Sequence, residues 1–464
     1  MLVEHESNLT KAAMAGESKR RQCIASYHAM LEHIDLGGFA RKLHDEMVKH
    51  KVMYGDRVVC PFLRPSFVTR AQFELLRERV HAVATAMQIM VEYVLHDRSL
   101  QDFLGLTDIE RELISFDPGY KGISTTARFD SFLNGGSCNF VEYNAESPAG
   151  IGYTDAMSAI FMRRPEFREF AQENNIVPFD LSKVLLETIL ECWREWSNNS
   201  NRKPTIAIVD FAGVPTHHEF YMLGEYFDAH GCKTVVTDHR SLEYDGEHLS
   251  FEGENIDVLY RRVLTNEFIE KMDEARPMYQ AVKDGNICMV NSFRSKILHK
   301  KSIFALLTDP KYQERLTTEQ TQAIKSSISW TRRFADIRTT DPSGNEVELL
   351  NYVRKHRNEL VLKPNDSYGG HGIYFGWEQK ENDWERSMDA ALGHDYLVQE
   401  RIPVTRELFP SWSSENGLEW GEYIVDLDPY VFNYHMSGAT ARLSLSSLCN
   451  VTSGGGSLPC FMID

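Results

Sequence analysis

Apolar residues recur at helical spacing in the first part of the chain. They do so over residues 28–52 and again over residues 73–95, and Thr69 is a suitable N-cap residue for the second segment. The pattern predicts a mainly helical segment over residues 1–120, in which residues 1 to about 20 form a loose arm.

The pattern changes to alternation near residue 130. Two alternating segments, residues 125–133 and 137–144, flank Asn134-Gly135-Gly136, a sequence typical of a tight turn between antiparallel strands. These residues predict a β-hairpin. Its polar side chains are expected either to line a site or only to face water.

Four polar side chains of this hairpin are candidates for chemistry. Arg128 and Asp130 lie two residues apart on the first strand, and Glu142 and Asn144 lie two apart on the second, so each pair shares a face. A two-residue turn would point Glu142 away from Arg128. All four groups share one face only with an odd-length loop or a β-bulge, and we predict one of these. Carboxylate and amide oxygens are hard ligands that Mg²⁺ prefers.

A β-α-β pattern occupies residues 201–295. Its strand and helix segments are residues 205–210, 217–230, 233–237 and 256–262. A short hairpin is expected at Asp245-Gly246, and the loop after the first strand lacks the glycine fingerprint of a dinucleotide site. Arg261 and Arg262 end the third strand, where α/β folds place ligand contacts. There they serve either a ligand or a structural ion pair.

A glycine-rich loop follows the apolar run that begins at Leu360. The run leads into Lys363, then to proline, short polar residues and glycines over residues 364–372, and apolar residues resume at Ile373. This predicts a strand, a flexible loop and a second strand. A lysine at a strand end can bind a phosphate oxygen, and glycines let backbone N–H groups approach an anion. An ordinary hairpin loop would have the same composition.

Further segments flank this loop. A lysine cluster ending at Lys301 precedes an apolar helix, where it forms either a solvated face or part of a nucleotide pocket. Residues 315–358 are charged and predicted to be mostly helical. Residues 396–403 predict a strand, Arg442 lies on a later strand, and residues 450–457 form a second glycine-rich loop.

Composition limits the possible functions. The chain has 464 residues, 42% of them hydrophobic, so two or three soluble domains are expected. The formal charge of −17 argues against general nucleic-acid or membrane binding, and a phosphate ligand would need a local site screened by metal ions. The eight cysteines form no Cys-x-x-Cys pair, and the sequence has neither a signal-peptide pattern nor a membrane-length apolar run. We therefore expect a reduced, cytoplasmic protein.

These motifs, in this order, resemble the permuted branch of the ATP-grasp superfamily, which includes eukaryotic-type glutathione synthetases and glutathionylspermidine synthetases. The resemblance covers roughly residues 60–464. It implies an α/β (α+β) fold: a permuted ATP-grasp fold with an inserted β-α-β domain and a helical N-terminal segment. The implied parts are the helical segment 1–120, a substrate and magnesium part 121–200, the β-α-β domain 201–295 and the nucleotide-binding part 296–464.

The resemblance also implies roles for individual residues. Arg128 and Arg442 are implied as catalytic arginines that stabilise the transferred phosphoryl group and bind substrate. The implied magnesium ligands are Asp130, Glu142 and Asn144. The implied nucleotide-binding residues are Lys301, Lys363, Ser367, Gly369, Gly370, Gln399, Glu400 and Ile402. The implied substrate-binding residues are Glu146, Ser147, Arg261 and Gly455.

One position departs from the family pattern. Glutathione synthetases carry a glutamate metal ligand immediately before their glycines, whereas Ser367 and Tyr368 stand there in this chain. Asp366 is the nearest acidic residue, and it is our candidate for the remaining metal ligand.

The activity implied by the resemblance is an ATP- and Mg²⁺-dependent carboxylate–amine ligase. A substrate carboxylate takes the γ-phosphate, and an amine then displaces phosphate from the acyl phosphate to form an amide. A small-molecule kinase and a non-catalytic nucleotide-binding module are the alternatives. The expected partners are small-molecule carboxylate and amine substrates, with neither nucleic acid nor membrane, and large α/β enzymes often form homodimers.

Overall fold

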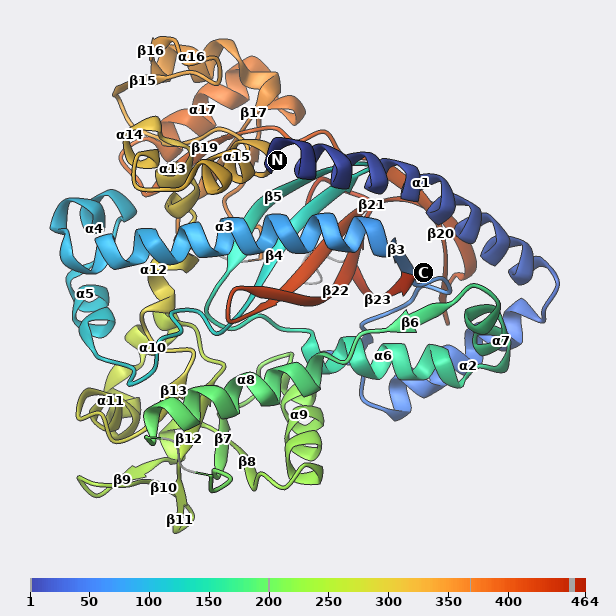
Figure 1. Ribbon diagram of the computed structural model, residues 1–464, viewed down its shortest axis with the longest axis horizontal. Helices are drawn as coiled ribbons and strands as arrows, with labels where there is room; N and C mark the ends of the chain where they lie inside the picture. Colours follow the sequence, from blue (N-terminus) through green and yellow to red (C-terminus); the bar gives the residue numbers. More distant parts are fainter. Residues whose placement is uncertain (1, 199–200, 368, 450–454) are drawn as a thin grey trace.

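The computed structural model describes residues 2–198, 201–367, 369–449 and 455–464. Figure 1 shows long helices crossing a central sheet, a second sheet with its helices at the upper left, and a parallel sheet at the bottom. The largest hydrophobic core lies between the central sheet and the helices that cover it. No helix in the described part of the chain is long and apolar enough to cross a membrane.

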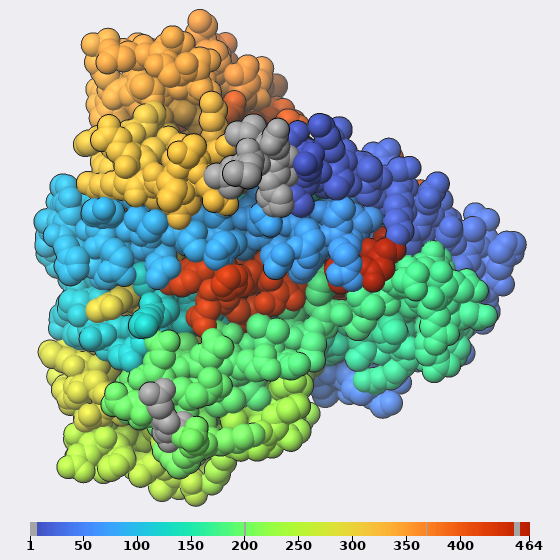
Figure 2. All heavy atoms as spheres, in the orientation of Figure 1, coloured from blue at the N-terminus to red at the C-terminus, as the bar shows by residue number. Residues whose placement is uncertain are grey.

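Two long helices dominate the N-terminal segment. α1 (Leu2–Glu32) and α3 (Arg70–His96) run across the molecule, as the blue bands in Figure 2 show. Thr69 caps α3, as predicted. The prediction of a loose arm over residues 1 to about 20 is wrong, because α1 already begins at Leu2 and buries Ala13 and Tyr27. The other elements are α2 (Leu36–Lys49), β1 (Met53–Tyr54), β2 (Arg57–Val58), β3 (Ser66–Thr69), α4 (Arg98–Leu104) and α5 (Asp108–Ser115).

The central sheet joins strands from distant parts of the chain. Its order is β3-β23-β22-β21-β4-β5, with β20 paired to β21 and β6 paired to β23. As a consequence, Arg128 on β4 lies opposite Tyr430 on β21. The strands are β4 (Thr126–Asn134), β5 (Ser137–Asn144), β6 (Ile176–Pro178), β20 (Arg406–Ser413), β21 (Gly417–Phe432), β22 (His435–Ser444) and β23 (Gly456–Ile463). The helices α6 (Ile151–Arg163), α7 (Pro165–Glu173) and α8 (Leu181–Trp196) follow the hairpin.

The β4–β5 hairpin contains the predicted bulge. Its turn has two residues, since Asn134 pairs with Ser137, and the register shifts by one residue between Asp130 and Ser131. Beyond the shift, Arg128 lies opposite Asn144 and Asp130 lies opposite Glu142. Directly opposed residues of an antiparallel pair share a face, so all four polar side chains point to the same side.

The β-α-β unit has four parallel strands in the order β13-β12-β7-β8. They are β7 (Ile206–Val209), β8 (Thr234–Thr237), β12 (Val258–Arg261) and β13 (Cys288–Val290). The remaining elements are α9 (His217–Ala229), β9 (Glu243–Tyr244), β10 (Leu249–Phe251), β11 (Glu254–Ile256), α10 (Thr265–Glu270) and α11 (Arg276–Lys283). The chain leaves β7 toward β8 on one side and later returns to β12 on the other. The strand order therefore reverses between β7 and β12, which is where open α/β sheets bind ligands.

The glycine-rich loop belongs to a third sheet of order β14-β19-β17-β18. β17 (Leu360–Pro364) and β18 (Tyr374–Phe375) flank the loop antiparallel to each other, which confirms the strand–loop–strand prediction. β14 (Thr331–Arg333) and β19 (Tyr396–Glu400) complete the sheet. The surrounding elements are α12 (Ser295–His299), α13 (Ser302–Thr308), α14 (Pro310–Gln313), α15 (Thr318–Ser327), β15 (Arg338–Thr340), β16 (Glu346–Glu348), α16 (Leu349–Lys355) and α17 (Glu381–Ala391).

The expectation for residues 315–358 is only partly right. They contain α15 and α16 but also the three short strands β14, β15 and β16. β14 forms because it pairs with β19, about 65 residues further along the chain. The spacing of apolar residues within the segment itself does not show such a distant pairing. The boundaries given for the four parts of the chain, residues 1–120, 121–200, 201–295 and 296–464, remain predictions.

Candidate active site

A cavity of about 470 Å³ lies where the central sheet, the glycine-loop sheet and the β-α-β unit meet. Its walls come from β4 and β5, from β17 and the loop after it, from the end of β19 and from β21 and β22. Residues that follow β7 and β12 close one end. The predicted site residues that line this cavity are Arg128, Asp130, Glu142, Asn144, Ser147, Lys363, Gly369, Gly370, Gln399, Glu400, Ile402 and Arg442.

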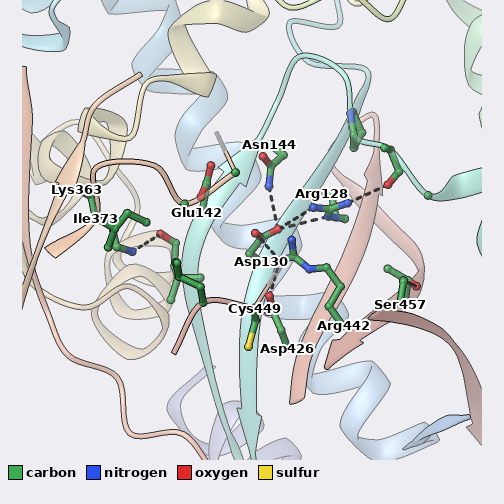
Figure 3. Close-up of a pocket in the computed structure, with 18 of the residues that line it drawn as sticks. Arg128, Asp130, Glu142, Asn144, Lys363, Ile373, Asp426, Arg442, Cys449 and Ser457 are labelled. Carbon is green, nitrogen blue, oxygen red and sulfur yellow. Dashed lines mark hydrogen bonds and ion pairs between the residues drawn. The ribbon is translucent and has the colours of Figure 1, made fainter. Parts of the chain in front are cut away.

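Lys363 faces the acidic hairpin. Its Nζ donates to Gln399 Oε1 at 2.7 Å and lies 3.5 Å from the carbonyl oxygen of Val141. Figure 3 shows Glu142 between Lys363 on one side and the Arg128–Asp130 pair on the other. Burial lowers the pKa of Lys363 to about 8, while Glu142 acts in the opposite direction. The polar face of the hairpin and Lys363 therefore line one shared cavity, although they lie more than 200 residues apart in the chain.

Arg442 is surrounded by carboxylates. It forms ion pairs with Asp130 and Asp426 (Figure 3). Its Nε also lies 2.7 Å from Asp428 Oδ2. Arg128 Nη2 lies 3.3 Å from Asp130 Oδ1. Burial would raise the pKa of Asp130, but the charges of Arg442 and Arg128 lower it on balance. Burial raises the pKa of Asp426 to about 6 and that of Asp428 well above its usual value.

Sequence reasoning missed Asp426 and Asp428. They lie two residues apart on β21, and Asp426 pairs directly with Arg442 on β22. The Asp-Leu-Asp alternation was the available signal, because it places both carboxylates on one face.

A short loop between the sheets is fixed by the cavity's own side chains. Arg128 Nη1 and the Tyr430 hydroxyl each donate to the carbonyl oxygen of Ala149 at 2.9 Å. From the β-α-β unit, Arg262 Nη1 donates to the carbonyl oxygen of Pro148 at 3.0 Å. The Glu219 carboxylate accepts the N–H of Gly150 at 2.8 Å. These bonds hold the loop that begins at Ser147 against both the central sheet and the β-α-β unit.

The arginine at the cavity is Arg262, not the predicted Arg261. Arg261 is fully buried, donates to the carbonyl oxygens of Asn291 and Val263, and lies 3.5 Å from Glu146. Consecutive residues leave a strand end on opposite sides, so only one of the two reaches the cavity. Glu146 is likewise fully buried and is not a lining residue.

Asp366 lies outside the cavity lining. Lys296 Nζ and Lys300 Nζ each lie 2.6 Å from its carboxylate oxygens. Two buried lysines require a counter-charge, so this carboxylate is used in a structural ion-pair cluster. That placement speaks against Asp366 as a metal ligand, because its oxygens already bind two ammonium groups.

Three other predicted residues, Lys301, Ser367 and Gly455, are not among the residues that line the cavity. Lys301 Nζ donates to the carbonyl oxygen of Ser367 at 2.6 Å and lies 3.0 Å from Glu142 Oε1. It lines a small adjoining cavity together with Glu142 and Lys363. The carbonyl oxygen of Gly455 accepts a hydrogen bond from Arg57. Residues 450–454 of the second predicted glycine loop lie outside the described residues.

Two acidic residues near the strand-order reversal were also missed. Asp210 follows β7, and it lines the cavity together with Glu267 and with Arg262, which the sequence analysis had named as one of two possible ligand contacts. Their positions at the carboxyl ends of parallel strands fit the general location of ligand sites in open sheets. His299 is a further lining residue; it stands in the lysine-rich segment that the sequence analysis named, but it was not assigned a role there.

The described lining is close to balanced in charge. Its carboxylates are Asp130, Glu142, Asp210, Glu267, Glu400 and Asp426, and its lysine and arginine side chains are Arg128, Arg262, Lys363, Arg401 and Arg442. The described residues contain no group of three or more His, Cys, Asp or Glu side chains arranged to hold a metal ion. Asn144 donates its amide N–H to Asp130 at 2.9 Å, which leaves its side-chain oxygen as the atom it offers to a ligand. A carboxylate and an amide oxygen, from Glu142 and Asn144, fit the donor set of Mg²⁺.

Comparison with solved structures defines the fold class. The chain is similar to a glutathione synthetase-like effector from Globodera pallida in its apo form, with a TM-score of 0.58 and 13% identity over 92% of this chain and 97% of that one. A putative gamma-glutamylcysteine synthetase from Methylobacillus flagellatus has a TM-score of 0.38 and 8% identity over 78% and 82% of the two chains, too low to carry an argument. No protein-family model and no curated protein matches the sequence. The chain thus shares the fold of this glutathione synthetase-like effector, in agreement with the predicted α/β fold class.

Proposed function

We propose that this protein is an ATP-dependent carboxylate–amine ligase that forms an amide through an acyl phosphate and releases ADP and phosphate. One observation carries the proposal: Lys363, at the start of the glycine loop, and the polar face of the β4–β5 hairpin line the same cavity. A phosphate-binding lysine and a set of oxygen ligands within one cavity are the parts that phosphoryl transfer requires.

The nucleotide would lie at the end of the cavity formed by β17 and β19. Lys363 and the backbone N–H groups of Gly369 and Gly370 would bind its phosphates, and Gln399 to Ile402 would bind its base. Both glycines have positive φ, +72° and +78°, a backbone conformation that glycine adopts without strain. Lys301 would hold Glu142 and the glycine loop in position through its ion pair with Glu142 and its hydrogen bond to the carbonyl oxygen of Ser367.

Mg²⁺ would be held by Glu142 and Asn144, with Asp130 beside them. Because the described lining carries six carboxylates against five lysine and arginine side chains, the protein by itself does not neutralise a triphosphate. The metal ion would supply the missing positive charge. Arg128 and Arg442 would then act on the reacting carboxylate and phosphoryl group, held in place by Asp130, Asp426 and Asp428.

The substrates would enter from the β-α-β side. Ser147, Arg262 and Glu267 line that end, so the cavity offers both cationic and anionic side chains to a polar substrate. Closure of the glycine loop would keep water from the acyl phosphate.

The test is a coupled assay for ADP release with ATP and Mg²⁺. Amino acids and short peptides, γ-glutamylcysteine among them, serve as carboxylates, and glycine and spermidine serve as amines. A ligase releases ADP steadily only when a carboxylate and an amine are both present. ADP release that does not depend on the amine would indicate a kinase, and the absence of release and of thermal stabilisation by ATP would refute nucleotide use altogether.

A further inference from the structure

An apolar wall lines the cavity at the end that the β-α-β unit closes. It consists of Tyr54, Val59, Tyr153, Val214 and Pro215. These residues come from the segment around β1 and β2, from the first turn of α6 and from the loop between β7 and α9. None of the five is charged, although the cavity elsewhere carries both carboxylates and cations.

The three parts of the apolar wall are in contact with one another. The N–H of Gly55, in the turn between β1 and β2, donates to the carbonyl oxygen of Pro215 at 3.4 Å. The Tyr153 hydroxyl donates to the carbonyl oxygen of Met53 at 2.8 Å. Because this hydroxyl is already bonded to the main chain, Tyr153 offers its ring to a ligand.

The pairing of β1 with β2 turns Tyr54 toward the cavity. Tyr54 lies directly opposite Arg57 and shares its face, whereas Met53 points to the other face. The Arg57 guanidinium donates to the carbonyl oxygen of Gly455 at 3.0 Å and lies 5.7 Å from the centre of the Tyr54 ring. Ser457, two residues after Gly455, lines the cavity. Tyr54 is partly exposed, so its ring is accessible to a ligand.

The helix α6 turns Tyr153 in the same direction. Gly150 is the N-cap residue of α6 and lines the cavity, and Tyr153 follows three residues later on the same face. Gly152 lies on another face, because a Cβ atom there would meet Glu219 and Leu223 of α9.

The apolar wall continues from the place that we assign to the reacting carboxylate. Arg128, which would act on that carboxylate, donates to the carbonyl oxygen of Ala149 at 2.9 Å. Ala149 and Gly150 both line the cavity. Tyr153 lies three residues beyond Gly150, a rise of about 4.5 Å along the helix. A side chain of the molecule that carries the reacting carboxylate can span such a distance.

We propose that the carboxylate substrate carries an apolar side chain, aliphatic or aromatic, which binds against Tyr54, Val59 and Tyr153. This inference rests on the proposed ligase function and names the class of its carboxylate substrate. Each CH₂ group buried against the wall strengthens binding about fourfold. A polar side chain of the same size loses its hydrogen bonds to water there. Asp210 and Arg262, which line the same end, would bind the polar groups of this substrate.

The experiment compares leucine with asparagine as the carboxylate, each as the free amino acid and as its γ-glutamyl dipeptide. The two side chains have nearly the same size and branching, and only that of leucine is apolar. Hydroxylamine in excess, with ATP and Mg²⁺, displaces phosphate from the acyl phosphate and gives a hydroxamate, so the product reports the carboxylate substrate alone. We expect kcat/KM for hydroxamate formation to be roughly tenfold to a hundredfold higher with leucine.

Two variants test the place of this preference. Tyr54→Ala should lower the leucine-to-asparagine ratio roughly fivefold or more, because it opens the wall to water. The matched control is Met53→Ala, which shortens the neighbouring side chain on the opposite face of the hairpin; Met53 is not among the described residues that line the cavity. This control should keep the wild-type ratio. A ratio of two kcat/KM values does not depend on the folded fraction, so partial misfolding does not affect the comparison.

The outcomes that overturn the inference are distinguishable. A ratio near or below one in the wild-type protein overturns the apolar side chain and leaves the ligase intact, and so does hydroxamate formation confined to other carboxylates. Equal ratios in the two variants overturn the placement at Tyr54. Wild-type protein that forms no hydroxamate and releases no ADP with any carboxylate overturns the ligase and the inference together.

Discussion

Replacement of Lys363 by methionine should stabilise the ligand-free protein and weaken its response to nucleotide. The ammonium group is buried, and its hydrogen-bond partners are Gln399 and the carbonyl oxygen of Val141. Burial lowers its pKa from 10.5 to about 8, which corresponds to a cost of about 3 kcal/mol for keeping the charged form in the folded state. Methionine removes that cost and loses about 1 kcal/mol of hydrogen bonding. We therefore expect a net gain of about 2 kcal/mol at pH 7.

The pH dependence of folding stability provides a second test of whether the charge of Lys363 destabilises the folded protein. The pKa in the folded protein lies below that of the unfolded chain, so between the two values the unfolded chain binds more protons. Wild-type stability should therefore rise as the pH increases from about 8 toward 10.5, and this rise should be absent from the methionine variant. Urea unfolding at pH 7, 8 and 9 measures it.

Nucleotide binding should change in the opposite direction. A charge-assisted hydrogen bond to a phosphate contributes about 1.5–3 kcal/mol, so the variant should bind ATP–Mg²⁺ roughly tenfold to a hundredfold more weakly. Wild-type affinity should fall above pH 8 as the lysine loses its proton. Isothermal titration calorimetry and thermal shift both report this.

Lys300→Met is the contrasting variant. Lys300 is also buried, but it pairs with Asp366 and Glu110 away from the cavity lining. Its removal should destabilise the protein and leave the nucleotide response of the folded fraction intact. A Lys363→Met protein that is less stable than wild type and still responds to ATP would refute the reasoning.

Three further predictions follow from individual side chains. Arg128→Ala should still bind ATP but release ADP on the order of a hundredfold more slowly, and near-normal release would remove Arg128 from the mechanism. Gly370→Val should slow turnover because φ is +78°, whereas Gly344→Val, at +86° on the exposed β15–β16 turn, should leave it unchanged in the same assay. Asp366→Asn should lower the free energy of unfolding, measured with urea, by about 3–5 kcal/mol, because it leaves Lys296 and Lys300 without their counter-charge. An unchanged free energy of unfolding together with loss of the Mg²⁺ dependence of activity would instead identify Asp366 as a metal ligand.

Local rules of the sequence were sufficient for the elements that carry the site. Alternation around Asn134-Gly135-Gly136 predicted the hairpin, and the need for a common polar face predicted its bulge, which the register contains. The run from Leu360 through Lys363 predicted a strand and loop because the signal is contained within neighbouring residues. The same holds for Thr69 as the cap of α3.

Only the tertiary structure decided which charged groups reach the cavity. Arg261 and Arg262 are adjacent in sequence, yet one is buried against Glu146 and the other lines the cavity. His299 stands beside the predicted lysine cluster and lines the cavity, yet it was given no role. Asp366 was assigned to a metal although two lysines hold it. The physical reason is that a buried charge is governed by its partners, and these partners come from distant strands and helices. Sequence spacing determines the face of a strand on which a side chain lies, and packing determines what that face meets.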